Sequence, residues 1–401
     1  MEQGKCAPGQ KAGGGREWTQ LILAAAGMVM GIGQTALLTT LPLLMQRTGL
    51  ALEFITMILA SGSLAFLAGA PCWGLLSRRL GPRCIVAVAL AGFGLSHMLL
   101  FWQLGQGSDW EGQGKTLLAG RFLYGLTVSG LVPTCQAWLL AGACQRQQRA
   151  VLSRFSAALA LGRSLGPALV AGSLWLSPSG PFLLVALSAW PVLLMLPLAV
   201  PCHAESGCAG WPDWHLQALL GWPVLTLVIV TAFGLMQYAL GPWLMLCMKL
   251  DAATASSQLG WMLSAGTLVV AALQIGVVPY CKPGRSLLRA GSVGLVLAGM
   301  LLAQATTTLT AMGGVVALGV AAALLGPDCT ARALQAAGKS GQAWMAGMVA
   351  TVHTTGLALG AVLAGWTLGL SPSAPFWLAA FLGLGVVLAS LMARVPGEAL
   401  R

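Results

Sequence analysis

The sequence predicts an all-α membrane protein with twelve transmembrane helices in two six-helix repeats and both termini in the cytoplasm. The first indication is composition: mean hydropathy is +0.82, 57% of residues are hydrophobic and 8% are charged. In soluble domains about a quarter of the residues are charged. The second indication is a series of apolar stretches long enough to cross a bilayer, and the third is an internal repeat. Together they predict a polytopic membrane protein.

About 20 mostly apolar residues span a hydrocarbon core, and the chain divides at its charged and Gly/Pro-rich clusters into twelve such stretches. They are 18–45, 51–76, 84–104, 115–141, 151–176, 181–200, 216–246, 254–280, 286–304, 308–335, 342–369 and 374–393. The predicted organisation is an N-terminal tail (1–17), a bundle (18–200), a central loop (201–215), a second bundle (216–393) and a C-terminal tail (394–401). The first apolar run is long enough to span, so we expect no cleaved signal.

The second half of the chain repeats the first. The stretch "LGRSLGPALVAGSLWLSPSGPF" from Leu161 parallels "TGLALGAVLAGWTLGLSPSAPF" from Thr355, with equivalent residues 194 apart (356 − 162). An earlier pair of stretches, around Gly62 and Gly266, matches at an offset of 204 (266 − 62). Each half is therefore one six-helix unit, the arrangement typical of transporters that are built around a central site.

Lysine and arginine are distributed unequally between alternate loops. One face carries Lys5, Lys11, Arg16, Arg78, Arg79, Arg83, Arg146, Arg149, Arg154, Lys282, Arg285, Arg289, Arg332, Lys339, Arg394 and Arg401, and the other carries Arg47, Lys115 and Lys249. The positive-inside rule places the richer face, with both termini, in the cytoplasm. The net charge of +11 thus reflects membrane topology, and no nucleic-acid partner is expected.

The ten cysteines lie mainly on cytoplasmic loops or within spans, so we expect reduced thiols. Cys202, His203, Cys208 and His215 are close together in the central loop. Their spacing matches no tight ligand pattern, and neither a metal nor a cofactor is expected.

Three motifs carry a family resemblance. Between spans two and three, "GLLSRRLGPR" (74–83) is followed in span four by "RFLYG" and in span five by "GRSLGP" (162–167). These resemble the loop, R-x-x-x-G and G-x-x-x-G-P motifs of the major facilitator superfamily, the last typical of its drug:proton antiporter branch. The resemblance implies an exporter, with gating or motif roles for Gly74, Arg78, Arg79, Gly81, Arg83, Gly162, Gly166 and Pro167. Arg78 replaces the acidic residue of the loop motif, and Gln34 is the polar residue of span one, where many relatives carry a carboxylate.

Charged side chains at membrane depth are costly and indicate function. Arg163 lies near the middle of span five, Arg121 in span four and Asp328 in span ten. Their repeat equivalents are Leu357, Val315 and Thr134, so packing symmetry does not require the charges.

For Arg163 we favour an anion-binding role, because a guanidinium binds a carboxylate through two parallel hydrogen bonds and stays charged. The alternative is an arginine that hydrogen-bonds backbone carbonyls at a helix interface. Arg121 is assigned to substrate binding or to the proton coupling that the family resemblance implies. Asp328 is either a proton carrier or the ion-pair partner of Arg332, one turn later. His353 and His97 are further proton candidates, with helix packing as the alternative.

Polar residues in the paired first spans, Gln34 in one and Gln237 with Tyr238 in the other, precede Pro42 and Pro242. We expect breaks at these prolines and polar residues lining a cavity, with Gln136 as a further substrate-binding candidate. Interhelical hydrogen bonds are the alternative role. Glycines 162 and 166, and 356 and 360, are spaced for close helix packing.

These observations predict a proton-coupled exporter in the inner membrane that moves a small anion, such as a carboxylate siderophore, by alternating access, as a monomer. The alternative is a multidrug or tetracycline-like proton antiporter, and a more remote one is a non-transporting sensor. A single buried acid argues against an enzyme, and the sequence contains no G-x-x-x-x-G-K-S/T phosphate-binding loop.

Overall fold

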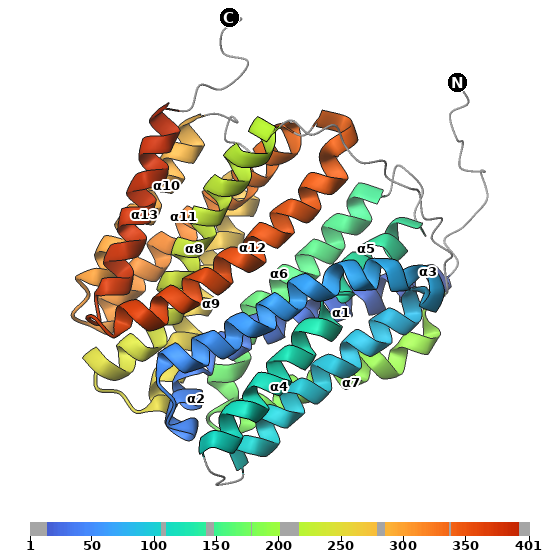
Figure 1. Cartoon of the computed structure of the whole chain (residues 1–401), viewed down its shortest axis with the longest axis horizontal. Helices are drawn as coiled ribbons and strands as arrows, with labels where there is room; N and C mark the ends of the chain where they lie inside the picture. The colour runs from blue at the N-terminus through green and yellow to red at the C-terminus, as the bar shows by residue number, and fades with distance from the viewer. Residues whose placement is uncertain are drawn as a thin grey trace, which may run out of the picture. The chain divides into compact units, whose positions relative to one another are not determined.

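The computed structural model describes residues 14–105, 110–141, 148–177, 179–200, 216–278, 285–336 and 338–392. The regular elements in these ranges are helices (Figure 1). The first half contains α1 (Gly14–Thr39), α2 (Leu41–Thr48), α3 (Leu52–Gly105), α4 (Trp110–Val128), α5 (Leu131–Ala141), α6 (Gln148–Ser173), α7 (Gly180–Met195) and the 3-10 turn η1 (Leu196–Leu198). The second half contains α8 (Leu216–Cys247), α9 (Ala252–Gly276), α10 (Arg285–Ala303), α11 (Thr308–Ala336), α12 (Gly338–Leu368) and α13 (Ala374–Met392).

Eleven helical stretches of the described residues are long and apolar enough to cross a membrane. The expected fourth span, 115–141, forms α4 and α5, separated by a distortion at Ser129 and Gly130. The amide of Ser129 still donates to the Gly125 carbonyl at 3.3 Å, and that of Thr134 to Gly130 at 3.2 Å. The helical path therefore continues through the distortion, although neither part alone is long and apolar enough to span.

Spans two and three are joined by helix rather than by an open loop. α3 runs through both, and its non-helical residue is Gly81, with φ 74° and ψ 158°. Glycine adopts this conformation without the steric cost that a side chain would add. The loop motif thus lies at a sharp change of direction within α3.

The predicted proline breaks are confirmed in one half and wrong in the other. α1 ends at Thr39 and α2 begins at Leu41, just before Pro42. In contrast, α8 continues through both Pro223 and Pro242 to Cys247. A membrane helix tolerates proline where neighbouring helices satisfy the freed carbonyl, so Pro242 marks no end of helix.

The chain divides into two compact units, one of residues 1–40, 47–49 and 61–209 and the other of 41–46, 50–60 and 210–401. In the first unit, α1 packs extensively against α6 and also contacts α5 and α7. In the second, α8 packs in the same way against α12, and α10 packs against α11 and α13 (Figure 1). The first helix of each unit therefore lies against the fifth span of that unit.

Glycines make these two contacts close. A Cβ at Gly162 would collide with the main chain of Met28 in α1, and one at Gly166 would lie 2.7 Å from the Ile32 carbonyl oxygen. In the second unit, a Cβ at Gly360 would lie 2.6 Å from the Thr231 carbonyl oxygen in α8. Real Cβ atoms do not approach carbonyls so closely, so the helix backbones touch where small residues allow it.

The repeated turn after the fifth span has the same hydrogen bonds in both units. The amide of Leu176 donates to the Ser173 carbonyl at 3.1 Å, and that of Leu370 to Thr367 at 3.0 Å. Each of these residues is 194 positions from its counterpart, so the sequence repeat is also a structural repeat.

Candidate substrate-binding site

Arg163 lies on one of two exposed stripes of α6. Ser156, Ala160 and Arg163 are exposed on one stripe, while Leu161 and Leu165 are exposed on nearly the opposite side. Residues at spacings of three and four share a helix face, and a lipid-facing stripe is apolar. The leucine stripe suits lipid, and the stripe with Arg163 suits an aqueous path.

Arg163 is held by Gln34 of α1. Its Nε donates to the Gln34 Oε1 at 2.9 Å. Between Ile22 and Leu44, Gln34 is the exposed residue of a helical segment that is otherwise buried or partly buried. The accessible surface of this part of α1 is thus concentrated where Gln34 meets Arg163. No carboxylate pairs with Arg163 within the described ranges, so its charge is not neutralised by them.

Arg121 of α4 lies over an aromatic ring. Its guanidinium carbon is 4.4 Å from the ring centroid of Tyr124, one turn later in the same helix. A cation over the face of an aromatic ring is attracted by the ring quadrupole. Arg163 is also within electrostatic range of Tyr124, so this tyrosine connects the two arginines.

Tyr124 also contacts the second half of α3. The His97 ring meets the Tyr124 ring edge-on, with centroids 5.6 Å apart, and stacks on Phe93 with centroids 4.4 Å apart. The Tyr124 hydroxyl is 3.8 Å from the sulfur of Met30 in α1. Arg121, Tyr124, His97 and Phe93 therefore form a connected cluster beside the Arg163–Gln34 pair.

The second unit has the same backbone contact without the charge. A Cβ at Gly62 would lie 3.0 Å from the main-chain oxygen of Arg121, and one at Gly266 would lie 3.0 Å from the side chain of Val315. These pairs are repeat equivalents, so valine supports the same packing as arginine. The cationic site is therefore specific to the first unit.

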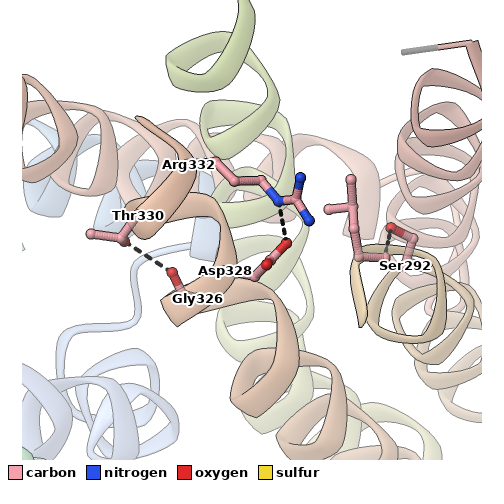
Figure 2. A network of polar contacts seen from close by, with 6 residues as sticks. Ser292, Gly326, Asp328, Thr330 and Arg332 are labelled. Atoms are coloured by element: carbon pink, nitrogen blue, oxygen red, sulfur yellow. Dashed lines mark hydrogen bonds and ion pairs between the residues drawn. The ribbon is translucent and has the colours of Figure 1, made fainter. Parts of the chain in front are cut away.

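Asp328 forms an ion pair with Arg332 in α11 (Figure 2). The Arg332 Nε lies 2.7 Å from the Asp328 Oδ2, and the two side chains are 13% and 7% exposed. The Arg332 guanidinium also lies 5.2 Å from the ring centroid of Trp222 in α8. Of the two alternatives for Asp328, this structure contains the ion pair.

The four other polar candidates lie on different helices from Arg163, Gln34 and Arg121. Gln136 is partly buried on α5, Gln237 and Tyr238 are partly buried on α8, and His353 is partly buried on α12. The three on α8 and α12 belong to the second unit. Within the first unit, the structure brings together Arg163, Gln34 and Arg121.

In the loop motif, Arg83 donates a hydrogen bond to the Ala199 carbonyl after η1. Arg79 is exposed, and the backbone of Gly74 and Arg78 lies within α3 while their side chains are outside the described part of the chain. The motif thus ties α3 to the end of α7. The histidines and cysteines of the central loop also lie outside the described residues, and the described ones contain no group of three metal-ligating side chains.

Sequence reasoning missed Tyr124 and Phe93 at the first cluster and Trp222 at the second. Tyr124 follows Arg121 by three residues, a spacing that places both on one helix face, so the signal was present. No local pattern connects Phe93 or Trp222 to the arginines, because these contacts depend on tertiary packing.

Comparison with known proteins identifies the class. Residues 23–275 match the family described as the Major Facilitator Superfamily, and this is more than half of the chain. The chain belongs to this superfamily, and it is a membrane transporter. No curated protein matches it in sequence.

Solved transporters share the fold. A mutant of the nucleoside transporter NupG has a TM-score of 0.74 and 12% identity, covering 93% of this chain and 99% of its own. The human organic anion transporter MFSD10 has a TM-score of 0.68 and 18% identity, covering 94% and 99%. A D-xylose-proton symporter has a TM-score of 0.71 and 15% identity, covering 95% and 98%. At these identities the similarity concerns the fold.

Proposed function

We propose that this chain exports a small organic anion by alternating access, in exchange for protons, and that a polycarboxylate such as a siderophore suits its site best. We place it in the inner membrane as a monomer with both termini in the cytoplasm. The motif of the fifth span supports export in exchange for protons, and the positive charges of the site support an anionic cargo.

One observation supports the anionic cargo: within the described residues, Arg163 bonds to the neutral amide of Gln34 and to no carboxylate. A cation without a counter-charge at membrane depth is costly, and a bound anion relieves that cost. The nearby Arg121 adds a second positive group. A cationic drug would instead be repelled by this site.

The human organic anion transporter among the similar structures shows that the fold is compatible with such cargo. Because its identity is low, the argument depends on the residues of this chain. Gln136, Gln237 and Tyr238 stay candidates for further contacts with the cargo in other conformations.

Inside-out membrane vesicles test the cargo. When the lumen is acidified, they should accumulate radiolabelled citrate, and Arg163→Gln should reduce the initial rate at least tenfold. Arg154→Gln is the matched control, since Arg154 is an exposed arginine nine residues before Arg163 (163 − 154) in the same helix, α6. Accumulation of ethidium instead of citrate would support a multidrug antiporter, and absence of flux for both would support a sensor.

The proton carrier is tested separately. We expect Asp328→Asn to remove the dependence of transport on the pH gradient, because the amide cannot exchange a proton. If the dependence persists in this variant, coupling belongs to His353 or Arg121 rather than to Asp328.

A further inference from the structure

The bond between Arg163 and Gln34 determines which hydrogen-bonding groups both residues have left. Arginine carries N–H donors and no acceptor, so the atom of Gln34 that faces Nε at 2.9 Å must be the oxygen. This assigns the amide orientation on chemical grounds rather than by convention. The Gln34 NH2 group and the two terminal nitrogens of Arg163 have no hydrogen-bond partner in the described ranges. The free nitrogens of the pair therefore present donors, while the Gln34 Oε1 keeps one acceptor lone pair.

The backbone keeps the pair in place. Gly162 and Gly166 flank Arg163 in α6 and are in direct contact with α1, and a Cβ at Gly31 would lie 2.8 Å from the Arg163 amide nitrogen. Gln34 and Arg163 are thus mounted on two helices that touch on both sides of the bond. Such a preorganised arrangement loses little conformational entropy on binding.

The occupied Nε also limits how an anion approaches Arg163. A carboxylate can bind a guanidinium side-on, through Nε and one terminal nitrogen, or end-on, through both terminal nitrogens. Gln34 takes the Nε hydrogen, so the end-on approach is the one left. The NH2 group of Gln34 carries two further N–H donors and can donate to a second oxygen-rich group of the same ligand.

We propose that Gln34 and Arg163 form one donor-rich subsite that selects organic anions carrying several carboxylates over monocarboxylates and over neutral, hydroxyl-rich molecules. This rests on the proposed function and specifies its cargo. Gln34 is the residue that determines specificity: it positions the guanidinium and supplies donors for the second carboxylate. A ligand without enough acceptors leaves these donors unpaired, which is costly at a desolvated site.

Thermal unfolding of the purified full chain in detergent, followed by tryptophan fluorescence, measures binding, because a ligand of the folded state raises the midpoint. The probes are citrate, its neutral triethyl ester and butyrate. We expect citrate to bind the wild type at least tenfold more tightly than butyrate, and triethyl citrate to cause no shift. Gln34→Leu should reduce the citrate-to-butyrate preference at least tenfold, a change that a purely structural role for Gln34 would not cause.

Two further variants test the subsite in case Gln34→Leu does not fold. Gln34→Glu should abolish the citrate shift, because the new carboxylate neutralises Arg163. Arg163→Lys should weaken citrate binding at least tenfold, because an ammonium lacks the planar pair of N–H donors of a guanidinium. Gln304 is an exposed glutamine directly after α10, and Gln304→Leu should bind citrate like the wild type. Midpoints without ligand show which variants are folded.

The outcomes separate the two proposals. If Arg163→Gln abolishes the citrate shift but Gln34→Leu and Gln34→Glu bind citrate with wild-type preference, the donor-rich subsite is wrong and the anionic cargo stands. If neither citrate nor butyrate shifts the wild type, both proposals are overturned.

Discussion

Gly162 of α6 lies against the main-chain carbonyl of Met28 in α1, with no space for a side chain between them. This contact brings together the two helices that carry Arg163 and Gln34. Close packing in a membrane depends on such small residues, because lipid provides no hydrophobic drive for helix association. In this transporter, the glycine contact and the geometry of the candidate site are therefore one structural feature.

Gly162→Ala should destabilise the first unit by about 1–3 kcal/mol, the usual cost of overpacking. The thermal midpoint in detergent measures the loss. Gly172→Ala is the control in the same helix, because a Cβ there would meet nothing within 4 Å. That variant should be neutral or slightly stabilising, because alanine stabilises a helix relative to glycine by about 0.5–1 kcal/mol. Equal effects of the two variants would contradict the packing argument.

Asp328→Asn should destabilise the second unit, since it leaves the guanidinium of Arg332 partly buried against Trp222 without a counter-charge. Breaking a buried pair from one side costs about 3–5 kcal/mol, and slight exposure places the expected loss near the lower end. The double variant Asp328→Asn/Arg332→Gln should lose less stability than the sum of the single variants. Additive losses in thermal unfolding would mean that the pair is not energetically coupled.

Asp251 should make the start of α9 sensitive to acid. Hydrogen bonds from Thr254, and then from the Ala253 amide, hold the pKa of Asp251 below its ordinary value, which is about 3.9. A depressed pKa in the folded state means that the cap stabilises at pH above the ordinary value and is lost as pH falls through the folded-state value. The protection that the cap gives the first α9 amides against hydrogen exchange should thus be constant between about pH 5 and 8 and should decrease below about pH 4.

Substitutions separate the charge of Asp251 from its capping role. Asp251→Ala should speed exchange at neutral pH by removing the acceptor, at a cost of about 1 kcal/mol. Asp251→Asn keeps an acceptor and should remove the acid sensitivity. An unchanged pH profile in the asparagine variant would assign the sensitivity to another group.

Sequence alone could predict much of the fold. Hydropathy and the 194-residue repeat indicated the helices and their grouping, and the four-residue spacing of Gly162 and Gly166 indicated close packing. The continuation of α8 through Pro242 was not predictable, because neighbouring helices decide whether a proline interrupts a membrane helix. Nor was the tertiary contact at the distortion between α4 and α5, where Gly130 packs against Trp73 and a Cβ would lie 2.7 Å from the Trp73 Cγ.

For the site, sequence identified Arg163, Arg121 and Gln34 as polar residues at membrane depth, but not which of them touch. The rotation of α6 about its axis, relative to α1, decides that Arg163 reaches Gln34 rather than lipid. This rotation results from the glycine contact as a whole and not from a local preference. The contact of Arg121 with Tyr124 is predictable from sequence, because both residues lie on one helix three positions apart. The contact of Tyr124 with His97 is not, because it joins two helices.

The end of α7 should depend on a side chain from α1. The Val200 amide donates to the Thr19 Oγ1 at 2.8 Å, and the Val200 carbonyl accepts from the Trp138 Nε1 at 3.1 Å. Thr19→Val keeps the shape but removes the acceptor, so the amide is left without its partner. A partly buried hydrogen bond contributes about 0.5–1.5 kcal/mol, and exchange of the Val200 amide should therefore become about two- to tenfold faster.

Thr39→Val is the control on the same helix, because the Thr39 hydroxyl bonds the Thr35 carbonyl of its own helix at 2.9 Å. It should leave Val200 exchange unchanged. The adjacent Ala199 carbonyl accepts a hydrogen bond from Arg83 of the loop motif. Side chains of α1, α3 and α5 therefore all bond to the segment after η1. If Thr19→Val also leaves exchange unchanged, Arg83 and Trp138 are sufficient to hold the segment, and the contribution of α1 is negligible.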